Sequence, residues 1–187
     1  MARIVFLHGL ESKVDTDLVP TGSKARHLRG HYGAETVALD TRVAQDFKLS
    51  LGAEGFTYPF EGYDEAFAVP MQRAREALRD DTELVIGSSF GGAVLLRLLH
   101  ETPGWRGPSI FLAGAGVKLT PHRSLPDGIP VELIHGQRDT VVLLADSELL
   151  ASTSDAARIT VIDDEHRLST VVDGVLDAAI ERLVGGG

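Results

Sequence analysis

The stretch Leu84-Val85-Ile86-Gly87-Ser88-Ser89-Phe90-Gly91-Gly92-Ala93 joins an apolar, β-branched run to a segment of small residues. The run predicts a buried strand, and residues 90–100, which are apolar on more than one side, predict a buried central helix. Between them lies Gly-x-Ser-x-Gly, the pattern of a tight turn that holds a serine hydroxyl at the top of a sheet. The stretch therefore predicts a strand, a sharp turn and a helix, with Ser89 as the candidate nucleophile.

Two serines stand in this turn, and the spacing of the glycines favours one of them. Gly87 and Gly91 lie two residues either side of Ser89, whereas Ser88 is off centre. At the N-terminus of the following helix, free amides and the helix dipole favour developing negative charge. Ser88 stays the alternative hydroxyl, and a glycine-rich structural turn is the alternative to a reactive one.

Short apolar runs recur along the chain, each followed by a longer segment with helical spacing. This alternation is typical of parallel strands joined by crossover helices. The helical spacing is clearest at Phe67, Met71, Ala74 and Leu78 and at Val171, Val175, Ala179 and Leu183. We expect an α/β fold with one mainly parallel six-stranded sheet flanked by helices, its strands at 4–7, 35–39, 83–86, 109–113, 131–134 and 158–162.

A serine hydroxyl becomes a good nucleophile only when a base takes its proton and an acid orients that base. With a turn of this kind, the acid and then the histidine follow the serine, each on a loop after a later strand. Asp139 and His166 follow the last two predicted strands in that order. They are the candidate acid and base, although Asp139 could instead only cap the next helix or turn.

The remaining histidines and acids fit these roles less well. By their places in the sequence, we expect His27 and His31 in the first helix, His100 at the end of the central helix and His122 in a loop. We expect the other two histidines, which precede glycines at strand ends, to support turns, and the three acids before His166 to be solvated, with one of them as a reserve acid. These residues are His8, His135, Asp163, Asp164 and Glu165.

An acyl-transfer intermediate needs amide donors for its oxyanion. The candidates are the amide of Phe90, directly after the nucleophile, and that of Leu10, in the loop after the first strand. Residues 40–64 show no clear periodicity and form an unusually long connection, which usually signals function or mobility. Its aromatic residues make Phe56, Tyr58 and Phe60 candidates for substrate binding.

Composition excludes several other classes of protein. The 187 residues suit one domain, 43% hydrophobic and 24% charged residues are ordinary for a globular chain, and no apolar run is long enough to cross a membrane. The apolar run at 4–7 is too short for an export signal, and the chain has no cysteine, so we expect a cytoplasmic protein. A formal charge of -9 with scattered Lys and Arg argues against nucleic acid as a partner.

No cofactor or metal is expected either. The glycine clusters match neither a phosphate-binding loop nor a dinucleotide-binding fingerprint. His27 and His31 have metal-like spacing, but Leu28 stands where a zinc protease would carry its glutamate. We expect these two histidines to lie on a solvated helix face.

With these features in order, the sequence resembles the α/β-hydrolase superfamily over nearly its whole length, and its small single-domain bacterial serine esterases in particular. The resemblance rests on His8-Gly9-Leu10 and on residues 87–92, 135–139 and 164–167. It implies one α/β-hydrolase domain over 1–187 that lacks the family's first two strands and has little or no lid. It also implies that Ser89 attacks an acyl carbonyl, that His166 accepts and then donates the proton, and that Asp139 holds His166.

The resemblance favours a carboxylesterase or thioesterase that acts on a small acyl substrate through an acyl-enzyme intermediate. A peptidase or lactonase with the same three residues is one alternative, and a binding or interaction protein that keeps the fold is another. The fold alone does not choose between them. The sequence predicts no oligomeric state.

Overall fold

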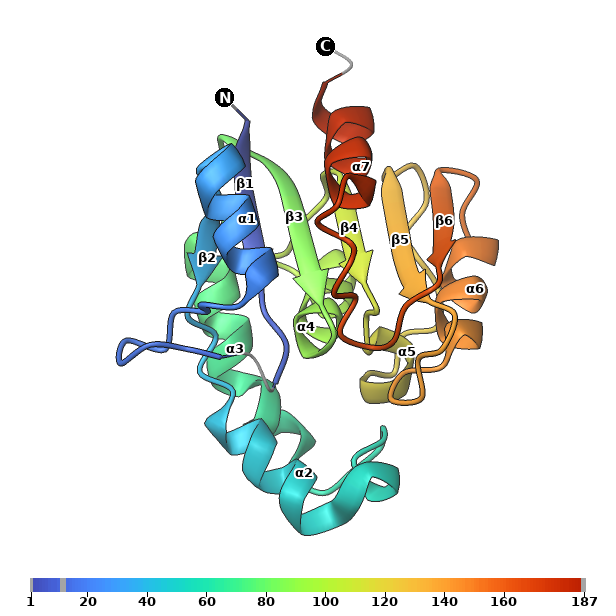
Figure 1. Cartoon of the computed structure of the whole chain (residues 1–187). Coiled ribbons are helices and arrows are strands. Elements are labelled where there is room, and N and C mark those ends of the chain that lie inside the picture. Colours follow the sequence, from blue (N-terminus) through green and yellow to red (C-terminus); the bar gives the residue numbers. More distant parts are fainter. Residues whose placement is uncertain (1, 11–12, 186–187) are drawn as a thin grey trace.

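Six parallel strands form one sheet in the computed structural model, which describes residues 2–10 and 13–185 (Figure 1). The strand order is β2-β1-β3-β4-β5-β6, and every neighbouring pair is parallel. All carboxyl ends therefore lie on one edge of the sheet, the lower edge in Figure 1. The six expected strands are confirmed, as β1 (Arg3–Leu7), β2 (Glu35–Val37), β3 (Thr82–Ser88), β4 (Ser109–Leu112), β5 (Val131–Gly136) and β6 (Ala157–Ile162).

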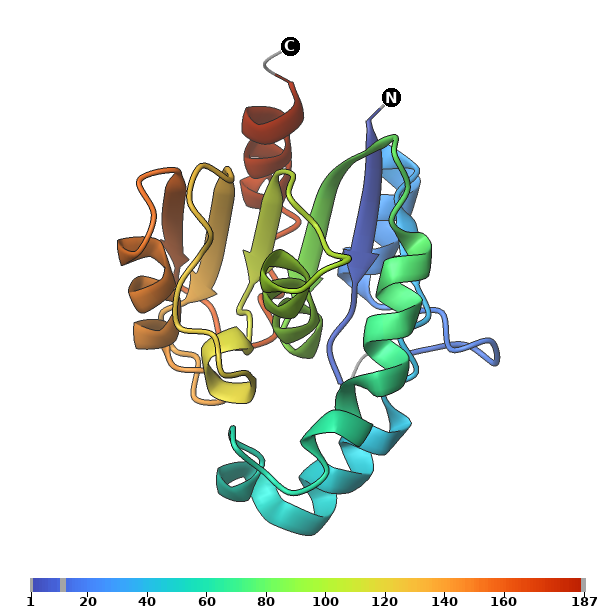
Figure 2. The ribbon, with the colours of Figure 1, turned by 180° about the vertical axis from the view of Figure 1, so that it is seen from behind.

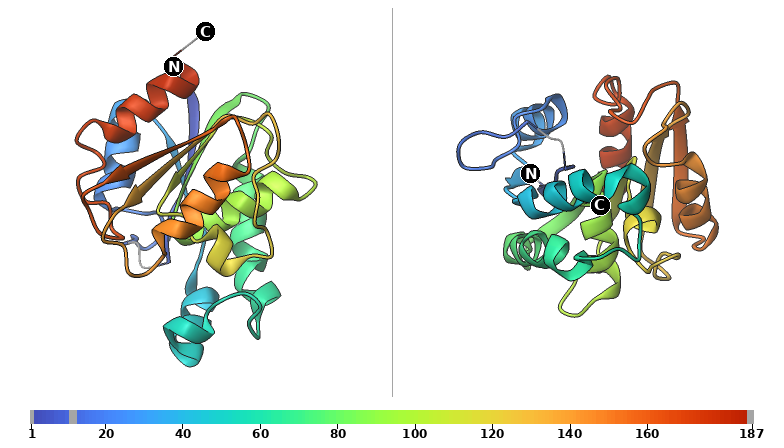
Figure 3. Two further views of the ribbon diagram at one scale, coloured as in Figure 1. Left: turned by 90° about the vertical axis from the view of Figure 1, so that its right-hand side faces the viewer. Right: turned by 90° about the horizontal axis from the view of Figure 1, so that it is seen from below.

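Helices cover both faces of the sheet. Two of them, α1 and α7, lie on one face, and α3, α4 and α6 lie on the other, as the view from behind and the side views show (Figures 2 and 3). The described helices are α1 (Ser23–Tyr32), α2 (Arg42–Gly55), α3 (Tyr63–Ala77), α4 (Phe90–His100), α5 (Gly116–Leu119), α6 (Leu144–Ser152) and α7 (Val175–Val184).

The central strands β1, β3 and β4 are mostly apolar because both faces of the sheet are covered. Successive side chains of a strand point to opposite faces. Ile4 and Phe6 of β1 accordingly pack in the cluster under α1 and α7, whereas Val5 and Leu7 pack in the cluster under α3 and α4. These four side chains are at most 2% exposed, so β1 is a central strand of the sheet.

The segment 40–64, for which we expected no regular structure, instead forms α2 and the start of α3. Among the described residues of α2 only Ala44 is buried, because the helix projects beyond the carboxyl edge of the sheet (Figure 1). Its apolar stripe is short, with Ala44, Phe47 and Leu51 at helical spacing and only Ala44 fully buried. Gly52, with φ 73° and ψ 172°, also kinks α2 and interrupts the spacing.

The expected helix around 171–183 begins later than its spacing suggests. Val171 is fully buried, but it lies in a turn, and α7 starts at Val175 after Gly174, which has φ 104°. The four-residue spacing therefore continues through a turn that packs on the same core. No helix in residues 2–10 and 13–185 has the length and apolar character needed to cross a bilayer.

Candidate active site

Ser89 occupies a strained turn between β3 and α4. Its φ of 51° and ψ of -114° place a non-glycine residue in a sparsely populated region. Backbone bonds on both sides hold this conformation: the Ser89 amide donates to Leu112 O at 2.9 Å, and the Ala115 amide donates to Ser89 O at 2.9 Å. Strain of this kind persists where the surrounding structure fixes it and is typical of functional sites.

The glycines around Ser89 are required by close backbone packing. A Cβ on Gly87 would lie 2.6 Å from Gly91 O, and one on Gly92 would lie 2.6 Å from Gly114 Cα. A Cβ on Gly91 would overlap the carbonyl of Leu7 in β1. The N-terminus of α4 therefore packs directly on the sheet, as expected from its small residues, and there is no room for a side chain at Gly87, Gly91 or Gly92.

A continuous chain of hydrogen bonds links the three residues that the sequence singled out. Ser89 Oγ lies 2.9 Å from His166 Nε2, and His166 Nδ1 lies 2.7 Å from Asp139 Oδ2. The residues come from loops after β3, β5 and β6, at the shared carboxyl edge of the sheet. The hydroxyl that meets His166 is that of Ser89, whereas Ser88 is the buried last residue of β3.

The Asp139 carboxylate is completely enclosed, with its side chain 0% exposed. Its Oδ1 accepts from the amides of Val141 at 2.8 Å and Val142 at 2.9 Å, so Asp139 both caps a turn and holds His166. Burial raises the pKa of this carboxyl, but hydrogen bonds from His135, His166 and Val142 lower it by more. The net pKa lies well below the usual range for aspartate, and the group is ionised at neutral pH.

Asp164 has a structural role that corrects the expectation of a solvated or reserve acid. Only 8% of the residue is exposed; its Oδ1 accepts from the Glu165 amide, and its Oδ2 accepts from the amide and hydroxyl of Thr170 at 2.9 Å. These bonds shape the loop that carries His166. Asp163 and Glu165 are exposed, as expected.

The acid loop and the histidine loop are joined directly. The Arg138 amide donates to Asp164 O at 3.0 Å, and a Cβ on Gly136 would lie 2.5 Å from that same oxygen. Because the two loops pack backbone against backbone, the distance between Asp139 and His166 is fixed by the main chain. Gly136 therefore lies where the two loops meet and leaves no room for a side chain.

Lys24 supports the loop that carries His166, a role that the sequence did not predict. Its Nζ donates to Arg167 O at 2.5 Å, so α1 supports the residue next to His166. Burial lowers the pKa of Lys24 to about 8, partly offset by the nearby charge of Asp164. Nothing in the sequence pairs a lysine near the N-terminus with a loop near the C-terminus, and only the folded arrangement does so.

The loop after β1 lies beside the nucleophile. A Cβ on Gly9 would come within 3.1 Å of Ser89 Cβ and 3.7 Å of Ser89 Oγ. Leu10 is nearly buried, and its carbonyl accepts from Gln45 Nε2 at 2.6 Å and from Thr41 Oγ1 at 3.3 Å. Phe90 is the first residue of α4, so its amide has no acceptor within the helix. Oxyanion binding by the Leu10 and Phe90 amides stays a prediction.

His8 supports this loop, in keeping with the role in a turn that we expected. The Leu39 amide donates to its Nε2 at 3.3 Å, so in the neutral ring Nδ1 carries the proton and donates to Gly9 O at 2.8 Å. Burial lowers the pKa of His8, which favours this neutral form. His8 thus ties the Gly9 backbone next to Ser89 to the segment after β2.

The aromatic residues of segment 56–63 stack toward the nucleophile turn. Phe56 is 4% exposed, and Tyr58 and Phe60 are half-buried. The Tyr58 amide donates to Lys118 O at 2.8 Å, which fastens the segment to α5. Their role in substrate binding stays a prediction. Ring centroids 4.7–5.6 Å apart follow the order Phe56, Phe60, Tyr63, Phe67 and Phe90.

The histidines of α1 differ from the expected solvated face. His31 is exposed, but His27 Nε2 lies 2.7 Å from Asp177 Oδ1 on α7, and the two histidine rings stack at 4.3 Å. Tyr32 also donates to Asp177 Oδ1, at 2.8 Å. In the part of the chain that the structure describes, no three histidine or acidic side chains are arranged to hold a metal ion.

Comparison with solved structures identifies the fold. No protein-family model matches the sequence, and no curated protein sequence matches it significantly. A protein assigned to the alpha/beta superfamily of hydrolases from Xanthomonas campestris pv. campestris superimposes with a TM-score of 0.65 and 20% identity, over 99% of both chains.

Two further structures show the same similarity. Alpha/beta hydrolase domain-containing protein 10 from mouse has a TM-score of 0.61 at 18% identity, over 97% of this chain and 89% of its own. The esterase RhEst1 from Rhodococcus sp. ECU1013 has a TM-score of 0.55 at 15% identity, over 97% and 88%. The chain has the α/β-hydrolase fold, and the resemblance seen in the sequence is confirmed at the level of the fold.

Proposed function

We propose that this protein is a serine hydrolase that cleaves a small carboxylic ester or thioester through an acyl-enzyme intermediate. The observation that carries the proposal is the unbroken chain from Ser89 Oγ through His166 to Asp139, with links of 2.9 and 2.7 Å. A nucleophile, a base within hydrogen-bond reach and a third group that orients the base form the arrangement that activates a serine. The esterase among the structures of the same fold adds support by analogy.

In the proposed reaction, Ser89 Oγ attacks the acyl carbonyl while His166 Nε2 accepts its proton. The tetrahedral oxyanion then faces the Phe90 and Leu10 amides, which lie on backbone fixed beside the serine. His166 next donates the proton to the oxygen or sulfur of the leaving group. Water repeats the sequence on the acyl-enzyme and restores Ser89.

The role of Asp139 in this scheme follows from its surroundings. Its lowered pKa keeps it ionised at neutral pH, so it accepts a hydrogen bond from the Nδ1–H of His166 and leaves Nε2 free to act as the base. It also stabilises the imidazolium that forms during attack. Both effects need a carboxylate, and neither needs Asp139 to take up a proton.

Labelling with a fluorophosphonate probe tests the mechanism before the substrate is known. We expect the wild type and Ser88→Ala to react and Ser89→Ala not to react. A panel of chromogenic esters of increasing acyl length, with matched thioesters, a lactone and a peptide, then defines the substrate. Loss of Ser89 should lower turnover by about 10⁴- to 10⁶-fold.

The result that contradicts the proposal is a folded Ser89→Ala protein that retains either labelling or turnover. An unreactive wild type that still captures a protein or small molecule would support the alternative of a binding protein on the same fold. Turnover of the lactone or peptide alone would replace the ester assignment and keep the mechanism.

A further inference from the structure

His135 lies directly behind the Asp139 carboxylate. The side chains of both residues are 0% exposed, and His135 Nε2 lies 3.3 Å from Asp139 Oδ2 and 3.0 Å from Val142 O. On the other side of the ring, Nδ1 lies 2.7 Å from the hydroxyl of Ser147 on α6. His135 therefore joins the acid of the candidate site to a helix that does not otherwise contribute to it.

The hydrogen-bond partners define the tautomer of this ring. Both neighbours of Nε2 are acceptors, a backbone carbonyl and a carboxylate, so Nε2 carries a proton. In the neutral ring Nδ1 is then an acceptor, and Ser147 donates its hydroxyl proton to it. Ser147 thus donates to His135, and the Nε2–H of His135 donates to Val142 O, with Asp139 Oδ2 at 3.3 Å from the same nitrogen.

We propose that His135 is a positioning residue for Asp139, with Ser147 fixing the orientation of its ring. Asp139 Oδ1 is held by the Val141 and Val142 amides, and Oδ2 is held by both His135 and His166. The inference rests on the proposed function, because it assigns His135 a part in orienting the base of that same site.

Val142 connects the two sides of this arrangement. Its amide donates to Asp139 Oδ1 at 2.9 Å, and its carbonyl lies 3.0 Å from His135 Nε2. The ring thus also fixes the turn that carries the amides. The titratable groups around the ring are Asp139 and His166 on one side and Asp146 of α6 on the other; burial raises the pKa of Asp146, and the charges of Arg123 and Lys118 oppose this.

Kinetics of three variants test the proposal. His135→Leu removes the donor, and we expect kcat to fall by about 10- to 100-fold, the range typical when residues that orient metal ligands are removed. KM should change little, because His135 is enclosed and does not reach a substrate. His135→Gln keeps an amide donor near the position of Nε2 and should restore most of kcat, and Ser147→Ala should give a smaller loss than His135→Leu.

His27→Leu is the matched control. His27 also contacts an aspartate, at 2.7 Å, but on the α1 and α7 side of the sheet. We expect its kcat to equal that of the wild type. Equal losses in His135→Leu and His27→Leu would point to general destabilisation and overturn the positioning role.

Proton NMR provides a readout that needs no substrate. The Nδ1 proton that His166 donates to Asp139 should give a far-downfield resonance. We expect this resonance to shift or broaden in His135→Leu and to persist in His135→Gln. If the wild type turns over no acyl substrate, the proposed function fails, and this resonance still tests His135. If folded His135→Leu shows an unchanged resonance and an unchanged kcat, the inference is wrong. If that variant does not fold, the same two results in Ser147→Ala would overturn the inference.

Discussion

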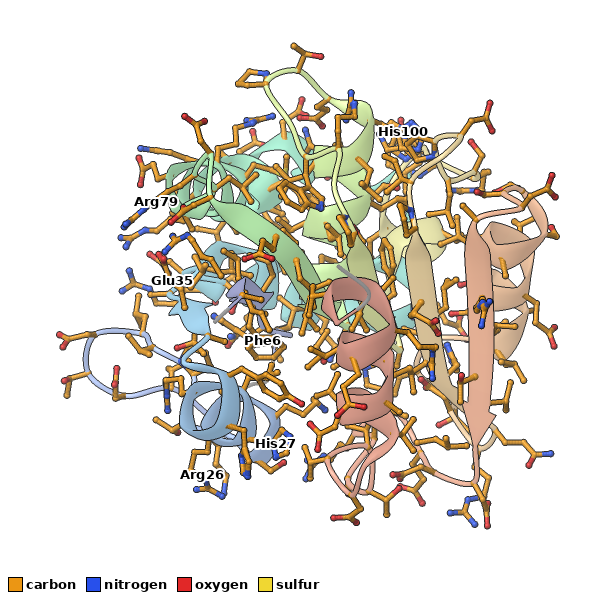
Figure 4. All side chains as sticks on the ribbon, turned by 90° about the horizontal axis from the view of Figure 1, so that it is seen from above. Phe6, Arg26, His27, Glu35, Arg79 and His100 are labelled. Atoms are coloured by element: carbon orange, nitrogen blue, oxygen red, sulfur yellow. The ribbon has the colours of Figure 1, made fainter. Side chains whose placement is uncertain are left out.

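Two aspartate–histidine pairs of equal length lie in different regions of this molecule. His166 Nδ1 lies 2.7 Å from Asp139 Oδ2, and His27 Nε2 lies 2.7 Å from Asp177 Oδ1. The first pair lies at the carboxyl edge of the sheet, beside Ser89. The second joins α1 to α7, with His27 on the side of α1 that faces α7 (Figure 4).

The two pairs differ in the burial of the aspartate and in the other groups that each residue contacts. The Asp139 side chain is 0% exposed, and it accepts hydrogen bonds from backbone amides of its own turn. The Asp177 side chain is 32% exposed, and its other partner is Tyr32. The far nitrogen of His166 meets a serine on a strained turn. A short hydrogen bond alone therefore does not distinguish the candidate site; the enclosed Asp139 and the contact with Ser89 do.

The largest expected effect separates the two pairs by mutation of the acid. Asp139→Asn should lower kcat by about 10⁴-fold, because an amide no longer selects the tautomer in which His166 Nε2 is the base. Asp177→Asn should leave kcat within about twofold of the wild type, since its pair contacts no reacting group. Steady-state kinetics on the best ester of the panel measures both variants.

Equal losses in the two variants would refute the contrast between the pairs. A folded Asp139→Asn protein with normal turnover would remove Asp139 from the mechanism. Circular dichroism of both variants serves as the folding control.

A second contrast concerns the glycines of the two regions. Gly91→Ala should destabilise the protein by about 3 kcal/mol or more, because its Cβ would overlap the carbonyl of Leu7 in a packed core. Gly30→Ala on α1 meets no atom within 4 Å and should stabilise the protein by about 0.5–1 kcal/mol through helix propensity. Urea denaturation measures both, and a Gly91→Ala protein as stable as the wild type would contradict the close packing at the turn.

The carboxyl-edge cluster was predictable because its signals are local or ordered along the chain. Gly87 to Gly91 identify the turn, and Asp139 and His166 each follow a recognisable strand. The partners of Asp139 were not predictable in the same way. His135 precedes a glycine at a strand end, as His8 does, and only the position of α6 brings Ser147 to its ring.

The regions that escaped prediction depend on contacts between distant segments. α2 fully buries a single described residue, and its apolar stripe of Ala44, Phe47 and Leu51 is short. His27 and Asp177 come from opposite ends of the chain, so their contact arises from the packing of α1 beside α7. Asp164 was expected to be solvated because a run of three acids is usually exposed, yet its loop closes around it.

Asp139 and Asp177 should also differ in how much they contribute to stability at acid pH, but by less than they differ in their effect on kcat. Burial raises the pKa of each carboxyl, but hydrogen bonds lower both pKa values by more, so each is ionised in the folded protein below the usual aspartate pKa of about 3.9. The stabilisation is therefore present above that pH and is lost as pH falls through the lower folded value. Asp139→Asn should flatten the loss of stability between about pH 5 and pH 2 more than Asp177→Asn does, because solvent screens the exposed pair.

The midpoint of urea denaturation, measured across this pH range, reports the difference. Asp40 and Asp164 also have lowered pKa values, so a residual acid dependence should persist in both variants. If Asp177→Asn reduced the acid-induced loss of stability more than Asp139→Asn did, the exposed pair would have the greater influence on stability, and this prediction would be wrong.

The smallest expected effect is the titration of Tyr32. Burial, together with the hydrogen bond and charge of Asp177, raises the pKa of Tyr32 to about 12, and burial also raises that of Tyr63 to about 12. The stabilisation from the neutral Tyr32 is present below the unfolded pKa of about 10 and is lost as pH rises through 12. Asp177→Asn should move the Tyr32 transition toward 10 and leave that of Tyr63 in place. Ultraviolet titration of tyrosinate, with Tyr32→Phe to assign the signal, measures the shift; an unmoved Tyr32 transition in Asp177→Asn would mean that burial and the charge of Glu181, rather than Asp177, raise this pKa.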